Sequence, residues 1–206
     1  MSFFDDKGTR ESEARSAAES ASGSITHRLT LDLSRAHDLA AMLASSRASK
    51  FIEISDLVAG MYLYAWDRLS AYWSEENRPK IEAILRTMCR ISPERWNYWI
   101  QFYDAQRKRA EPDSGWEKLK AFGKQQPDQS SPVPSTSLRA LFKEAAKASP
   151  FHDTKSRNVP ILTMECVLLS IVRTSRSDIA QKMRETRVDV AQLEKIAFDP
   201  KRSPLR

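Results

Sequence analysis

Glycine, cysteine and long apolar runs are all scarce in this chain of 206 residues. Five glycines are too few for a β-sandwich built on many tight turns, and two cysteines do not make a disulfide framework in a chain of this length. No apolar run approaches the roughly eighteen residues of a membrane span. The first residues lack the basic and apolar regions of a secretory signal. These absences predict a soluble, cytoplasmic, mostly helical protein without a membrane partner.

Groups that would carry catalysis or bind a metal are also missing from the sequence. The one Gly-Lys pair, Gly123-Lys124, is followed by Gln125, so the sequence has no Walker A loop for nucleotide phosphates. The three histidines are too scattered to form a metal cluster with the two cysteines. Cys89 and Cys166 have no neighbour that would lower a thiol pKa, so we expect both to be buried structural thiols. We therefore expect no enzymatic activity, no metal and no cofactor.

What is present is helical periodicity, because apolar residues recur at spacings of three and four along most of the chain. No segment alternates convincingly at period two, so the predicted fold class is all-α. The candidate N-caps of four of the helices are Asp32 or Ser34, Ser55 or Asp56, Ser92, and Ser137.

Two polar, Ser-rich stretches divide the chain into parts. Residues 16–24 are small and polar, and residues 125–135 combine prolines and serines without apolar periodicity. The predicted organisation is a disordered N-terminal segment over 1–24, a first helical repeat over 25–124, a linker over 125–136, a second helical repeat over 137–198 and a flexible tail over 199–206.

Two stretches in the second repeat resemble a known family. Leu162–Arg173 reads L-T-M-E-C-V-L-L-S-I-V-R and resembles the I-G-T-E-H-L-L-L-A-L-L-R stretch of the Clp/Hsp100 amino-terminal domain. Arg184–Asp189 is similar to the R-E-L-G-V-D turn of the same family. Phe51–Met61 aligns with the first pattern as an earlier copy of the unit.

The resemblance implies a bundle of eight or more helices in two pseudo-repeats that binds peptides, unfolded segments or adaptor proteins. This chain would be a divergent, stand-alone copy, because the Walker A loop of the ATPase modules is absent. The family's histidine is replaced by Cys166, and by Asp56 in the first copy. An aromatic-rich insertion from Tyr62 to Trp116 would enlarge the first repeat.

Aromatic side chains are concentrated in the first repeat, with thirteen of the eighteen between Phe51 and Phe122. They admit three interpretations: core packing, a groove for a protein or peptide, and a stacking platform for nucleic acid. We expect Trp66, Trp73 and Trp99 to pack, and Tyr62, Tyr98 or Tyr103 to be exposed. The candidate partner-binding residues of this half are Tyr62, Trp66, Trp73, Trp96 and Trp99.

Positive charge is concentrated in the last third, where residues 137–206 hold fourteen of the thirty-three basic residues and eight of the twenty-seven acidic ones. Arg173, Arg176 and Arg184 are candidates for the basic rim of a protein-binding groove. The same cluster could instead contact phosphates, or could simply form a solvated helical surface.

The leading hypothesis is a non-catalytic protein-recognition module, acting as an adaptor or as a sensor subunit of a stress or defence system. Its partner would be a protein or peptide, such as a Clp-type ATPase or an effector encoded in the same operon. The alternative is a helical nucleic-acid-binding protein that uses the basic last third, and homo-oligomerisation is compatible with both.

Overall fold

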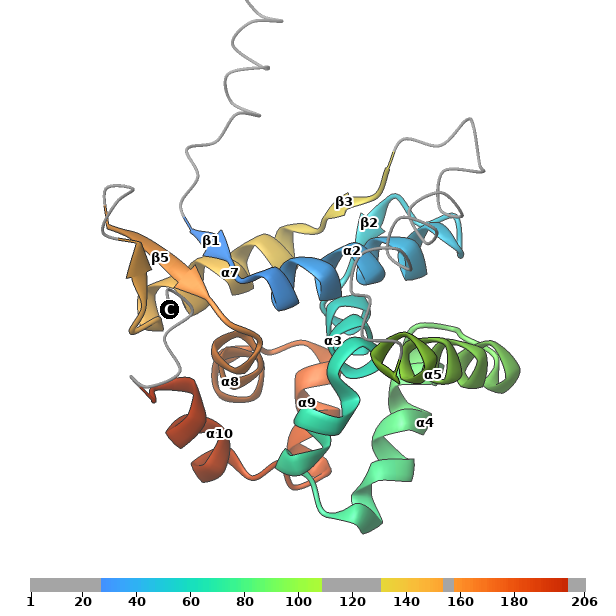
Figure 1. Ribbon diagram of the computed structural model, residues 1–206. Helices are drawn as coiled ribbons and strands as arrows, with labels where there is room; N and C mark the ends of the chain where they lie inside the picture. The colour runs from blue at the N-terminus through green and yellow to red at the C-terminus, as the bar shows by residue number, and fades with distance from the viewer. Residues whose placement is uncertain (1–26, 109–130, 154–157, 200–206) are drawn as a thin grey trace, which may run out of the picture.

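A computed structural model describes residues 27–108, 131–153 and 158–199, and these residues are mostly helical (Figure 1). This confirms the all-α class at the coarse level. The longer helices of the first half are α2 (Leu31–Ser45), α3 (Ile54–Leu69), α4 (Arg78–Met88) and α5 (Pro93–Lys108), with two short 3-10 helices, η1 (Ser70–Tyr72) and η2 (Glu75–Asn77). Those of the second half are α7 (Thr136–Ala148), α8 (Met164–Thr174), α9 (Asp178–Glu185) and α10 (Val190–Ala197).

Five short strands correct the expectation of a chain without β-structure. They are β1 (Arg28–Leu29), β2 (Phe51–Ile52), β3 (Val133–Pro134), β4 (His152–Asp153) and β5 (Val159–Leu162). Strands of two to four residues are too short to show alternation, so periodicity could not reveal them. β3 also lies inside the predicted linker, whose last residue, Thr136, already begins α7.

The strands pair across the two halves of the chain. β1, which precedes α2, pairs in parallel with β5, which precedes α8. β2, which precedes α3, pairs in parallel with β3, which precedes α7. In each pair, one strand precedes the first long helix of its own half of the chain. Its partner precedes the second long helix of the other half. Figure 1 shows the two pairs well apart, β1 and β5 on the left and β2 and β3 on the right.

The N-caps follow directly from these strands. Thr30, one residue beyond β1, accepts a hydrogen bond from the Leu33 amide, and Ser135, one residue beyond β3, caps α7 in the same way. Both caps precede the residues predicted from the sequence. Asp56 does not begin α3 but accepts a bond from the Glu53 amide at 3.0 Å, in a capping box.

The closest helix packing is between α2 and α3, at Gly60. A Cβ atom on Gly60 would lie 2.3 Å from the carbonyl oxygen of Ala36 and 3.1 Å from the amide nitrogen of Ala40. Only a glycine lets the two backbones approach this closely. The small residues therefore fix the position of α3 against α2.

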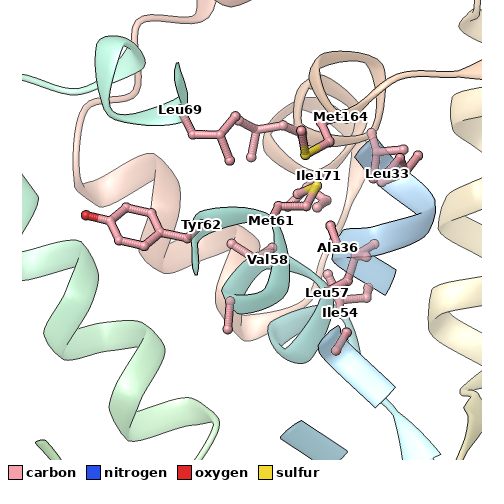
Figure 2. Packing of buried hydrophobic residues seen from close by; sticks show 14 of the residues in the cluster. Leu33, Ala36, Ile54, Leu57, Val58, Met61, Tyr62, Leu69, Met164 and Ile171 are labelled. Atoms are coloured by element: carbon pink, nitrogen blue, oxygen red, sulfur yellow. The ribbon is translucent and has the colours of Figure 1, made fainter. Parts of the chain in front are cut away.

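The two halves share one hydrophobic core. Figure 2 shows Met61 of α3 beside Met164 and Ile171 of α8, with Leu33 of α2 nearby, and all four side chains are buried. A second link joins η1 to the C-terminal helices, because the Trp73 indole donates to the hydroxyl of Thr186 at 3.1 Å. The two halves are thus parts of one folded unit in the described residues.

Candidate functional site

Four of the five aromatic residues that were candidates for partner binding lie in the core. Tyr62 and Trp96 are each 1% exposed and stack with ring centroids 6.1 Å apart, and Trp73 and Trp99 are also buried. The expectation that Tyr62 is exposed is therefore wrong. Its hydroxyl donates to Glu82 at 2.9 Å, and burial, reinforced by Glu82, raises the pKa of Tyr62. In this conformation these rings are not available to a partner.

The remaining aromatic candidates differ in their surroundings. Trp66 is half-buried, and the guanidinium of Arg78 lies 3.7 Å from the centre of its ring, a cation–π contact. Tyr98 is 59% exposed, as expected, and packs beside Trp99 and Phe102 on α5. The side chain of Tyr103 lies outside the described residues.

The three candidate arginines do not form one surface. Arg173 is ion-paired with Glu194 of α10. Arg184 donates to the carbonyl oxygens of Val172 and Ser175, so it satisfies the end of α8. Arg176 is exposed and lines a groove. Two of the three arginines predicted for the rim are thus held by contacts within the chain, which weakens the case for a phosphate-binding patch.

The groove at Arg176 is a cavity of about 560 Å³ between the two halves. Its walls come from the start of α3, from α7 and from the connection between α8 and α9. We call it the β2–β3 groove, because β2 and β3 lead into two of its walls. It is lined by Ile54, Ser137, Ala140, Leu141, Glu144 and Thr174–Ser177.

Two exposed apolar side chains lie on the strands that lead into two walls of this groove, outside its lining. Phe51 and Val133 are 51% and 46% exposed, and they are partners in the β2–β3 ladder. Phe51 precedes the groove residue Ile54 by three positions, and Val133 precedes Ser137 by four. Sequence analysis did not select either residue, because their exposure results from a two-residue ladder that leaves no periodic signal.

A second cavity, of about 310 Å³, lies where β1 and β5 lead into α2 and α8. We call it the Arg68 cavity. Arg68 of α3 reaches into it, with its Nη1 3.0 Å from Asp32 and its Nε 3.1 Å from the buried Glu165. The cavity is lined by Thr30, Leu31, Asp32, Arg68, Phe151, Thr163, Met164, Glu165 and Ile196.

Both cysteines are buried, as predicted, and burial raises the pKa of each thiol. A raised pKa keeps the thiols protonated at neutral pH, which disfavours a nucleophilic role. Asp189 has a structural role, because it caps α10 through a 2.9 Å bond from the Gln192 amide. Over the described ranges, no three His, Cys, Asp or Glu side chains are grouped so that they could hold a metal ion.

Within the part of the chain that the structure describes, no helix has the length and apolar character needed to cross a membrane. Comparison with family models, with curated proteins and with solved structures returns no match for this chain. The geometry of the β2–β3 groove and of the Phe51–Val133 pair is therefore what bears on function.

Proposed function

We propose that this protein is a non-catalytic protein-recognition module that receives a segment of a partner protein in the β2–β3 groove. The observation that carries the proposal is the pair of exposed apolar side chains, Phe51 and Val133, on the strands that lead to a groove lined in part by Ile54, Ala140 and Leu141. Exposed apolar side chains near a groove are typical of surfaces that bind an extended or helical segment.

The interpretation as two pseudo-repeats of the Clp amino-terminal type is part of this proposal. It is supported by the reciprocal strand pairing and by the alignment of the two patterns. α3 begins at Ile54 and α8 at Met164, which are the equivalent positions in the two aligned segments, and each helix follows a strand. A module of this type would act as an adaptor or a sensor subunit, with a Clp-type ATPase or an effector from the same operon as its partner.

The test compares proteins captured by three immobilised full-length chains from nuclease-treated extract of the source organism. These are the unaltered chain, Phe51→Ser/Val133→Ser and Lys195→Glu, the last a charge reversal on the exposed face of α10. The expected result is a set of proteins, identified by mass spectrometry, that the unaltered chain and Lys195→Glu retain and the double variant loses.

Equal capture by all three chains would refute the proposal. A nucleic-acid gel shift at low salt, with and without Arg176→Glu, checks the alternative function. A shift that disappears in Arg176→Glu and falls steeply with salt would favour nucleic acid over a protein partner.

A further inference from the structure

Three exposed basic side chains lie on the elements that carry the β2–β3 groove and the Phe51–Val133 pair. Lys50 directly precedes Phe51, and its carbonyl accepts the Val133 amide at 3.1 Å. Arg139 reaches back from α7 to β3, because its Nε donates to the carbonyl of Pro134 at 2.9 Å. Arg176 stands on the opposite wall, at the α8–α9 connection. All three side chains are exposed.

Three acidic residues lie in the groove lining or on the elements beside it: Glu144, Glu53 and Asp178, the last directly after the lining residue Ser177. Glu144 lines the groove, but the Lys147 ammonium lies 2.7 Å from its carboxylate. The Glu53 side chain accepts the Asp56 amide in the capping box of α3. These carboxylates keep their charge and offset part of the positive charge around the groove. With Lys147 counted, the four basic side chains exceed the three acidic ones by one.

From this arrangement, and resting on the proposed function, we infer the chemistry of the partner segment. It carries an aromatic or branched aliphatic anchor next to two or more Asp or Glu residues. The anchor packs on Phe51 and Val133 and enters the groove toward Ile54 and Leu141. The carboxylates face Lys50, Arg139 and Arg176. Complementary charges at the border of an apolar site favour one class of partner over others and accelerate its association.

The first experiment selects random twelve-residue peptides, displayed on phage, on the immobilised full-length chain after depletion on the Phe51→Ser/Val133→Ser variant. The expected result is enrichment of acidic peptides with an apolar anchor within three residues of the carboxylates. One enriched peptide is then synthesised with a fluorescent label, together with a copy in which every Asp and Glu is replaced by Lys.

Fluorescence anisotropy then separates the two kinds of contact. Because the anchor is lost, Phe51→Ser is expected to weaken binding about ten-fold or more. Arg176→Glu is expected to weaken it about five-fold at 50 mM salt and less at 300 mM, where screening is stronger. Lys195→Glu is the matched charge reversal and is expected to leave binding unchanged. The lysine copy of the peptide is expected not to bind.

Two results overturn the inference in distinguishable ways. Enriched peptides without acidic residues, or equal binding to the unaltered chain and Arg176→Glu, would show that charge does not select the partner, while the proposed function would stand. If no selected peptide depends on Phe51 and Val133 for binding, both the inference and the proposed function are refuted. A dimer that Phe51→Ser dissociates, seen by light scattering, would assign the groove to a second copy of this chain and also refute the inference. Circular dichroism checks that each variant is folded.

Discussion

The β2–β3 groove and the Arg68 cavity are built from equivalent parts of the chain and differ in what fills them. Each lies beside a pair of parallel strands. The Arg68 cavity lies at the N-termini of α2 and α8, and the β2–β3 groove lies at the N-termini of α7 and α3. In the Arg68 cavity, Asp32 and Glu165 are the second residues of α2 and α8. The second residues of α7 and α3 are Ser137 and Ser55, which have no carboxylates to hold an arginine.

The two sites also differ in the course of the chain after the helix that begins at the other site. α3 departs from helical geometry at Ala65, and the part beyond this kink brings Arg68 into the cavity, whereas α8 ends at Thr174. One site thus holds an ionic network that joins the halves beside a remaining cavity, and the other has no such network. The comparison teaches that the same backbone arrangement serves stability at one end and, under the proposed function, recognition at the other.

Among variants that bear on the two sites, the largest expected effect on stability comes from Gly60→Ala, which tests whether both sites depend on one helix. α3 supplies Ile54 to the groove and Arg68 to the cavity. The added methyl group would meet the Ala36 carbonyl, so α2 and α3 must separate. We expect a loss of about 3 kcal/mol in the free energy of unfolding, measured with urea. An unchanged midpoint would show that α3 is not held at this contact.

Arg68→Ala is expected to have the next largest effect on stability, because it removes the arginine side chain that pairs with two carboxylates in the cavity. It leaves the buried Glu165 without its partner, and we expect the free energy of unfolding to fall by about 2 kcal/mol. Arg173→Ala is the matched control, since it removes a pair with Glu194 whose two side chains are both exposed. That loss should not exceed about 0.5 kcal/mol in the same denaturation experiment. Equal losses would mean that Arg68 is no more structural than a surface arginine.

A smaller effect is expected from pH, at a contact between α2 and α7. The rings of His27 and His37 lie 5.4 Å and 6.2 Å from the ring of Phe142, and burial lowers the pKa of both histidines below 6.5, partly opposed at His37 by Asp38. The unfolded chain therefore binds more protons at low pH, so stability is complete above about pH 6.5 and is lost as the pH falls below it.

Urea denaturation at pH 7.5 and at pH 5.5 measures this loss. His37→Gln is expected to reduce the difference between the two midpoints. A difference of the same size in the variant would assign the effect to other groups.

The smallest effect on stability is expected from Phe51→Ser, because half of this side chain is already in water. We expect a change within about 0.5 kcal/mol, while binding of a partner is lost. Trp96→Ala is the contrasting variant, since that ring is fully buried, and it should cost about 3–5 kcal/mol. Thermal unfolding of both variants provides the measurement. A large loss in Phe51→Ser would place Phe51 among the core residues instead.

Prediction from the sequence succeeded where a local pattern carries the information. The spacing of apolar residues predicts a last helix over Val190–Ala197, and α10 has these bounds. Ser92 and Pro93 were predicted to begin a helix, and α5 begins at Pro93, with the Arg95 amide bonded to the Ser92 hydroxyl at 3.3 Å. These features depend on neighbouring residues alone, so helical periodicity and capping chemistry were sufficient.

The candidate site was predicted less well, because exposure is not a local property. The aromatic cluster was proposed as a binding surface, yet Tyr62 and Trp96 stack inside the core. The apolar residues that are exposed, Phe51 and Val133, lie eighty-two positions apart and meet only through strand pairing. Arg176 was selected from charge clustering and does line the groove, whereas Arg173 and Arg184 are held by their own neighbours.

The sequence by itself determined that this protein is helical, where most of its helices lie, and that its cysteines are buried thiols. Each of these follows from side-chain periodicity or from the chemistry of immediate neighbours. Only the tertiary structure decided which of two equivalent sites holds an arginine between two carboxylates. That outcome depends on carboxylates from distant segments, which come together only when the two halves share one core.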